Sequence, residues 1–196
     1  MHDQKPIISG IGSKRIIILL HGRGSNTEDI LSFAEQHLSP SKFIALQADN
    51  NQWYPYPFLM PKEKNEPYLS AALQAVDRVI KQTKAPLKDI FILGFSQGAC
   101  LAAEYAAQHP DKYGGIIVCS GGLIGEKIAP PKSSMKETPI FFGCSQNDPF
   151  IPISRVKESI NALKASKAKV TEHIYPGHSH TISDAEIKLI NLILKN

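Results

Sequence analysis

A serine lies between two glycines in the segment Gly94-Phe95-Ser96-Gln97-Gly98, which matches the pattern Gly-x-Ser-x-Gly. A serine hydroxyl is a weak nucleophile unless a neighbouring base removes its proton. In hydrolases with this pattern, the serine sits on a sharp turn between a buried strand and a helix, and the glycines let the backbone segments approach closely. The pattern therefore indicates Ser96 as the nucleophile of an acyl-transfer reaction. A simpler interpretation is a serine that caps an ordinary helix.

An acid and a base should follow the serine along the chain, in that order. Asp148 comes shortly after the apolar run 139–143, at the point where a strand would end. An aspartate before a proline also initiates turns, so Asp148 has a structural explanation too. Asp111 comes after a predicted helix, and the helix dipole explains Asp184 in the first turn of the last helix. We therefore take Asp148 as the candidate acid.

Two histidines remain as candidates for the general base. His109 precedes Asp148 and ends a predicted helix, and His173 lies inside a predicted strand. His178 and His180 both lie in the segment YPGHSHTIS between the last predicted strand and the last helix. This pair and Asp148 would also suit a zinc ion, so a metal-dependent hydrolase remains an alternative. The sequence contains neither a His-Glu-x-x-His helix nor a second acidic cluster, and we expect no metal.

Backbone N–H groups must stabilise the negative charge that develops on the attacked carbonyl oxygen. The N–H of Gln97 stands at the start of the predicted helix, and the segment LLHGRGSN offers the N–H of Arg23 as a second donor. The Gly-x-Gly of that segment, with Asp49 after the next strand, partly matches a dinucleotide-binding fingerprint. Thr27 occupies the position of its third glycine, so we expect no such cofactor.

Short apolar runs alternate with stretches of helical periodicity along the chain. Runs such as IIILL and GIIVC contain no polar residue, which is typical of strands buried on both faces. The alternation predicts an α/β fold with a mostly parallel sheet, whose ligands bind beyond the carboxyl ends of the strands. The predicted strands are 15–20, 43–47, 90–95, 115–119, 139–143 and 169–175, and the predicted helices are 67–84, 97–109, 153–166 and one that starts at a Ser183/Glu186 capping box.

Length and composition bound the class of protein. With 196 residues we expect one domain, 1–196, and the net charge of +4 comes from scattered basic residues that predict no nucleic-acid partner. No apolar stretch approaches the roughly 18 residues of a membrane span, so we expect no membrane insertion. We expect a cytoplasmic protein with reduced thiols, and the sequence leaves a homodimer open. The cysteines are Cys100, Cys119 and Cys144.

An aromatic and proline-rich segment, NQWYPYPFLMP (51–61), could form a wall of a substrate pocket. A surface loop packed on its own side chains is the alternative interpretation. We name Trp53 from this segment and Leu123 from the segment GGIIVCSGGL as candidate substrate contacts.

Seven segments together resemble the small carboxylesterase/lysophospholipase-like branch of the α/β-hydrolase superfamily, to which the acyl-protein thioesterases are related. They are LLHGRGSN, WYPYPF, EPYLSAALQAVD, GFSQGACLAAEYAAQHP, GGIIVCSGGL, GCSQNDPFIP and YPGHSHTIS, and the resemblance runs from about Lys14 to the end of the chain. It implies an α/β-hydrolase fold without a separate cap domain and a serine esterase without a cofactor. The roles that it implies are Ser96 as nucleophile, Asp148 as acid, His180 as base, and Arg23 and Gln97 as oxyanion donors.

Two positions depart from the pattern of the family. Arg23 stands where the thioesterases carry leucine, and His178 stands where relatives often carry methionine. The chain is also shorter than the thioesterases. We therefore expect hydrolysis of short- to medium-chain acyl esters, although lysophospholipids and thioesters suit the same three residues. A non-catalytic binding protein on a hydrolase scaffold is the alternative from another class.

Overall fold

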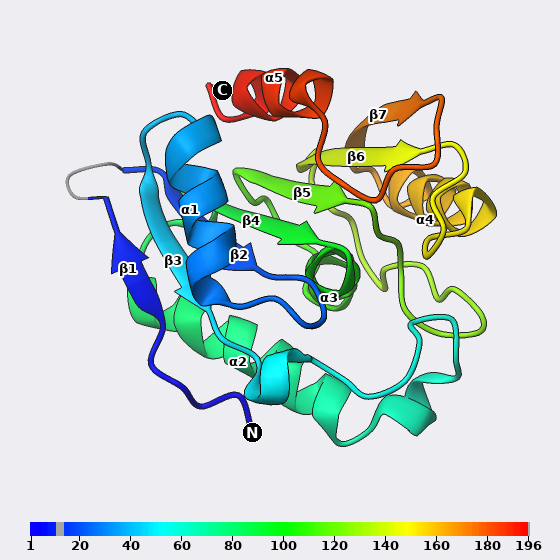
Figure 1. The fold of residues 1–196 in the computed structure, drawn as a ribbon, viewed down its shortest axis with the longest axis horizontal. Helices are drawn as coiled ribbons and strands as arrows, with labels where there is room; N and C mark the ends of the chain where they lie inside the picture. The colour runs from blue at the N-terminus through cyan, green and yellow to red at the C-terminus, as the bar shows by residue number, and fades with distance from the viewer. Residues whose placement is uncertain (11–13, 196) are drawn as a thin grey trace.

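The computed structural model describes residues 1–10 and 14–195, and these form a seven-stranded sheet with helices on both faces (Figure 1). Residues 11–13 and 196 of the expected domain 1–196 lie outside the described residues. The strand order is β1-β3-β2-β4-β5-β6-β7, and only β1 runs antiparallel to its neighbour in this sheet. The predicted α/β class and the mostly parallel sheet are therefore confirmed.

Each strand and helix that the sequence predicts is present, with bounds that differ by at most two residues. The short β1 and the helix α1 were not singled out by the sequence patterns. The strands are β1 (Ile7–Ser9), β2 (Ile16–Leu20), β3 (Lys42–Leu46), β4 (Ile90–Phe95), β5 (Gly115–Cys119), β6 (Pro139–Ser145) and β7 (Lys169–Tyr175), and the helices are α1 (Thr27–His37), α2 (Tyr68–Thr83), α3 (Gln97–Gln108), α4 (Ile153–Ala165) and α5 (Asp184–Ile193).

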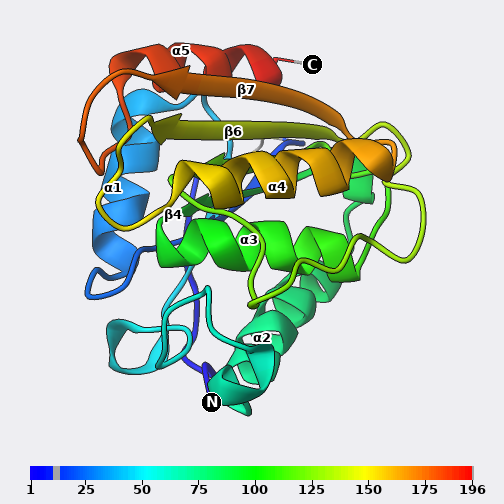
Figure 2. The ribbon, with the colours of Figure 1, turned by 90° about the vertical axis from the view of Figure 1, so that its right-hand side faces the viewer.

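The central strands are apolar on both faces because each face packs against its own layer of helices. Alternate residues of β2 belong to two separate hydrophobic clusters, with Ile18 on one face and Ile17 on the other. The helices α2, α3 and α4 cover the first face and are turned toward the viewer in Figure 2. The helices α1 and α5 cover the second face. The continuous apolar runs in the sequence follow from this double coverage.

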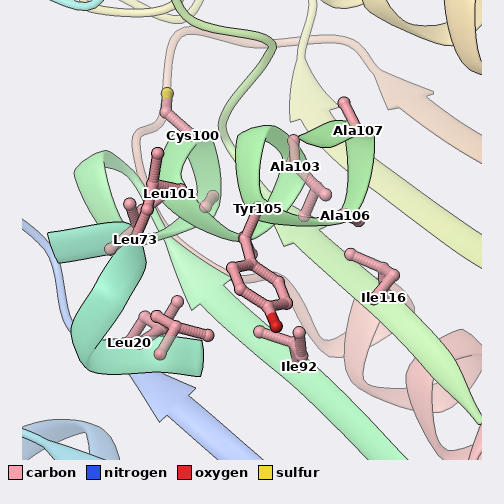
Figure 3. Close-up of a cluster of buried hydrophobic side chains, with 14 of the residues drawn as sticks. Leu20, Leu73, Ile92, Cys100, Leu101, Ala103, Tyr105, Ala106, Ala107 and Ile116 are labelled. Carbon is pink, nitrogen blue, oxygen red and sulfur yellow. The ribbon is translucent and has the colours of Figure 1, made fainter. Parts of the chain in front are cut away.

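Helix α3 lies close to the sheet because its inward side chains are short. Helix α3 packs against β4 and β5, and Figure 3 shows Ala106 of α3 on the side of the helix that faces Ile116 of β5. Alanine also has the highest intrinsic helix propensity, so the same residues favour the helix and its close packing. The N-terminus of α3 is thereby fixed at the carboxyl end of β4.

The parallel strands bring distant segments of the chain to one edge of the sheet. The strands β2, β4, β5, β6 and β7 all end at this edge, and the loops that follow them carry the candidate chemical groups. This is the edge at which open α/β sheets bind ligands. Within residues 1–10 and 14–195, no helix is both long enough and apolar enough to cross a membrane.

Candidate active site

Ser96 lies on a sharp turn that connects β4 directly to α3. Its φ of 53° falls in the left-handed region, which non-glycine residues rarely adopt. The turn is held because the N–H of Ser96 donates to the carbonyl oxygen of Cys119 on β5 at 3.0 Å. The Ser96 side chain makes no helix-capping hydrogen bond. The interpretation of Ser96 as a side chain that caps the helix therefore does not hold in this structure.

The two glycines that flank this turn are required by space. A Cβ atom at Gly94 would collide with the backbone carbonyl of Gly98. A Cβ atom at Gly98 would collide with the backbone carbonyl of Leu20 on β2. The Gly-x-Ser-x-Gly pattern thus permits the close approach of β2, β4 and α3 that exposes the serine hydroxyl.

A chain of hydrogen bonds joins Ser96, His180 and Asp148. His180 Nε2 lies 2.8 Å from Ser96 Oγ, although the two residues are 84 positions apart. His180 Nδ1 lies 2.8 Å from Asp148 Oδ2 and 3.0 Å from Oδ1. An ionised carboxylate can only accept hydrogen bonds, so Nδ1 carries the ring proton and Nε2 is free to accept the proton of Ser96.

Asp148 is held as a charged group at the base of its loop. Its Oδ1 accepts hydrogen bonds from the backbone N–H groups of Phe150 at 2.9 Å and of Ile151 at 3.1 Å. Burial by itself would raise the pKa of the Asp148 carboxyl, but the hydrogen bonds from His180 and Phe150 outweigh it and hold the pKa below its ordinary value. Asp148 therefore both initiates the turn and stays ionised beside His180.

The loop that carries His180 is tied to the loop that carries Asp148. Ser145 Oγ donates to the carbonyl oxygen of Ser179 at 2.7 Å. The N–H of Asn147 donates to the carbonyl oxygen of Gly177 at 3.0 Å. These bonds extend the pairing of β6 with β7, so the two loops keep a fixed separation.

Two aromatic rings pack against the imidazole of His180. The ring of Phe95 lies 5.0 Å from it between centroids, and the ring of Phe150 lies 4.9 Å from it in an edge-on arrangement. The His180 side chain is 16% exposed, whereas that of Asp148 is fully buried. The rings exclude water from the Asp148–His180 hydrogen bond, which strengthens this bond.

The structure separates the two candidate histidines. His178 is exposed, and the described residues offer its ring no hydrogen-bond partner. His180 instead contacts both Ser96 and Asp148. Across the described part of the chain, no three His, Cys, Asp or Glu side chains are grouped as metal ligands.

Arg23 and Gln97 line the same cavity as Ser96 and His180. Among the described residues, no acceptor pairs with either backbone N–H, so both N–H groups remain free to bind a ligand. The N–H of Gln97 also lies at the N-terminus of α3, where the helix dipole is positive. These features suit the oxyanion role that the sequence predicts for the two residues.

The side chains of Arg23 and Gln97 have a function that the sequence analysis missed, which is to hold the segment 52–56. The Arg23 guanidinium donates to the carbonyl oxygens of Tyr54 at 2.8 Å and Pro55 at 2.9 Å, and to Gln52 Oε1 at 2.8 Å. Gln97 Nε2 donates to the same Tyr54 oxygen at 2.7 Å. The planar fork of arginine suits several carbonyl acceptors at once, which leucine at this position could not bind.

A cavity of about 750 Å³ opens in front of Ser96. Its walls are mainly apolar and come from the segment 54–58, from α3 and from the loop after Asp148. The aromatic sequence pattern indicated the wall formed by the segment 54–58, but it did not indicate the wall formed by the loop after Asp148. Besides Ser96, His180, Arg23 and Gln97, the lining residues are Gly22, Ser25, Tyr54, Pro55, Pro57, Phe58, Phe95, Cys100, Pro149, Phe150 and Ile151.

Trp53 and Leu123, the substrate contacts that the sequence predicts, are both buried in the structure. Trp53 is fully buried, its Nε1 donates to the carbonyl oxygen of His21 at 2.9 Å, and its ring packs between those of His2 and His21. Leu123 is buried in the larger hydrophobic cluster. Neither residue lines the cavity, because both side chains point into the protein interior. Tyr54 and Phe58 from the same aromatic segment line it instead.

The chain matches a protein-family model described as "Phospholipase/Carboxylesterase" over residues 3–195. A solved phospholipase/carboxylesterase from Dyadobacter fermentans is similar to it, with 40% identity, a TM-score of 0.94, and coverage of 100% of this chain and 98% of that one. The similarity confirms the expected α/β-hydrolase fold.

Two curated relatives show more distant similarity. Carboxylesterase SOBER1 of Arabidopsis thaliana is 26% identical over 93% of this chain and 90% of that protein. Acyl-protein thioesterase 1 of Gibberella zeae is 28% identical over 54% of this chain and 47% of that protein. The family resemblance that the sequence motifs indicate is therefore confirmed.

Replacing Arg23 tests whether its side chain keeps the cavity wall in place. We expect Arg23→Leu to raise KM for a medium-chain ester about tenfold, equivalent to about 1.4 kcal/mol, because the segment 52–56 loses its guanidinium contacts. The change in kcat should be smaller, since the backbone N–H of residue 23 remains. Arg23→Lys keeps the charge but not the planar fork, so its KM, measured by steady-state kinetics, should lie between those of the wild-type protein and Arg23→Leu. An unchanged KM in Arg23→Leu would show that the wall holds without Arg23.

Proposed function

Because the chain belongs to the phospholipase/carboxylesterase family, we propose that it is a serine carboxylesterase that hydrolyses short- to medium-chain acyl esters. The observation that carries this proposal is the unbroken chain of hydrogen bonds from Asp148 through His180 to Ser96. Nucleophile, base and acid are each within hydrogen-bond distance of the next, as acyl transfer by a serine requires.

The first step is attack by Ser96 Oγ on the ester carbonyl carbon. His180 Nε2 takes the serine proton as the new C–O bond forms, and the ring becomes positively charged. The ionised Asp148 stabilises this charge and keeps the imidazole in the correct tautomer. The lowered pKa of Asp148 supports this role, because a protonated carboxyl could not stabilise the charge.

The negative charge on the tetrahedral intermediate requires donors that are already in position. We assign this role to the backbone N–H groups of Arg23 and Gln97, which have no acceptor among the described residues. The side chains of the same two residues bind the segment 52–56. Arg23 and Gln97 therefore supply the backbone donors and also hold the cavity wall in place.

Collapse of the tetrahedral intermediate completes the first half-reaction, and water completes the second. His180 returns its proton to the departing alcohol oxygen as the ester C–O bond breaks, and the acyl group stays on Ser96. Water then attacks the acyl-enzyme while His180 takes one of its protons, and His180 returns this proton to Ser96 Oγ as the acyl C–O bond to the serine breaks and the carboxylic acid leaves. Neither half-reaction needs a cofactor.

The cavity in front of Ser96 suits the acyl group, because the acyl carbon must bond to Ser96. Its volume of about 750 Å³ and its walls of Tyr54, Phe58 and Ile151 fit an apolar chain of short to medium length. A thioester would present the same carbonyl to Ser96, and the similarity to an acyl-protein thioesterase covers about half of that relative. Carboxylic esters are therefore the primary assignment.

Replacing Ser96 tests the proposed function most simply. We expect Ser96→Ala to lower kcat for p-nitrophenyl butyrate by about 10⁴-fold or more, because the nucleophile is lost. Ser32→Ala on the exposed face of α1 is the control and should retain the wild-type rate. Undiminished hydrolysis by Ser96→Ala would place the nucleophile elsewhere. A folded wild-type protein that hydrolyses no ester would support the binding-protein alternative.

The two histidines form a matched pair for testing the base. We expect His180→Ala to lower kcat by about 10³-fold or more, and His178→Ala to cost at most about tenfold, because only His180 reaches Ser96 and Asp148. If kcat fell strongly in His178→Ala and only slightly in His180→Ala, the assignment of His180 as the base would be overturned.

A further inference from the structure

A second, smaller cavity of about 290 Å³ also reaches His180. One of its walls is formed by α1, and another by the residues that follow His180 toward α5. Both cavities include Gly22, Ser25, Phe95 and His180, so they meet at the imidazole. The other residues that line the smaller cavity are Asp29, Ile30, Phe33, Thr181 and Ile182.

The two cavities differ in the reacting groups that line them. Ser96, Arg23 and Gln97 line the larger cavity, whereas His180 is the only member of the proposed machinery that lines the smaller one. After acylation the acyl group is bonded to Ser96 Oγ, which lines the larger cavity and not the smaller one, so the larger cavity is the nearer space for the acyl chain. The departing alcohol takes its proton from His180 Nε2, so its oxygen must be near the imidazole when the C–O bond breaks.

We propose that the smaller cavity binds the alcohol part of the ester and selects compact apolar alcohols. This inference rests on the proposed esterase function and adds to it the class of leaving group. As the tetrahedral intermediate collapses, the alcohol oxygen keeps the electron pair of the broken C–O bond and receives the proton from His180. The alcohol leaves through the cavity walled by α1, and the acyl group stays on Ser96.

The walls of the smaller cavity define the chemistry of the alcohol. Ile30, Phe33 and Ile182 present hydrocarbon surface, and Phe33 and Ile182 are only half-buried, so a ligand can cover them. A volume of about 290 Å³ accommodates one ring or a short branched chain. Bulky leaving groups, such as a peptide carrying a thioester, would extend beyond this cavity.

The charged group at this cavity disfavours phosphate-bearing alcohols. Asp29 is exposed, and its carboxylate accepts a hydrogen bond from Ser25 Oγ at 2.9 Å. Among the described residues that line this cavity, none is lysine or arginine. The phosphate of a glycerophosphate headgroup would therefore approach the Asp29 carboxylate with no cation on the walls of this cavity to offset the repulsion, which costs binding free energy. The cavity favours simple esters over lysophospholipids.

The inference can be tested with butyrate esters that differ only in the alcohol. Benzyl butyrate and 2-methoxyethyl butyrate have alcohols of similar acidity, so a difference in kcat/KM reports binding of the alcohol rather than leaving-group reactivity. We expect kcat/KM for the benzyl ester to be about tenfold higher, from the apolar surface that it covers. A third ester, 1-butyryl-glycerol 3-phosphate, whose headgroup carries no cation, should have a kcat/KM below that of the benzyl ester.

Two residues of α1 provide matched variants. Phe33 and Leu31 are both half-buried against the same hydrophobic cluster, but only Phe33 lines the cavity. We expect Phe33→Ala to lower the benzyl-to-methoxyethyl preference about fivefold and Leu31→Ala to leave this ratio unchanged. Ile182→Ala should lower the ratio in the same direction, which gives a second readout if Phe33→Ala does not fold.

The outcomes separate this inference from the proposed function. Equal kcat/KM for the benzyl and methoxyethyl esters, or the highest value for the glycerol phosphate ester, would overturn the inference and leave the esterase intact. If Phe33→Ala instead changed the acyl-chain preference at a fixed alcohol, the smaller cavity would hold the acyl group and the inference would be wrong. A wild-type protein that hydrolyses none of the esters would overturn the proposed function and the inference with it.

Discussion

The hydrogen bond between Asp148 and His180 is the interaction on which the rest of the site depends. It determines which ring nitrogen carries the proton, and it turns the other nitrogen toward Ser96 at 2.8 Å. The bond persists because Asp148 is itself fixed by two backbone N–H groups, and because the His180 loop is tied to β6 through Ser145. Without the pairing of β6 with β7, the base would have no fixed position.

A second constraint acts on the other side of the serine. The turn at Ser96 exists because Gly94 and Gly98 let α3 start against β2 and β4, and the N–H of Gln97 is presented at the same point. The side chains of Arg23 and Gln97 then fasten the aromatic segment beside this turn. The cavity wall and the oxyanion donors are thus parts of one hydrogen-bonded unit, and a change in the position of one affects the other.

The sequence predicted most of the fold and the main chemical groups because their signals are local. Buried strands produce continuous apolar runs, and the turn at Ser96 requires glycines at fixed spacing. The base was harder to identify from the residues alone, since His178 and His180 share one loop, and the family resemblance favoured His180. The burial of Trp53 was not predicted, because no periodicity reports which side chains of an irregular segment point inward. The guanidinium contacts of Arg23 join segments about 30 positions apart, and local patterns carry no information on them.

Covalent labelling with a fluorophosphonate, followed by peptide mass mapping, tests the central claim most directly, because the reagent reacts only with a serine whose proton is taken by a positioned base. We expect one label per chain, located on Ser96, and a labelling rate that falls sharply in His180→Ala but not in His178→Ala. A label on another serine, or no label on the folded wild-type protein, would contradict it.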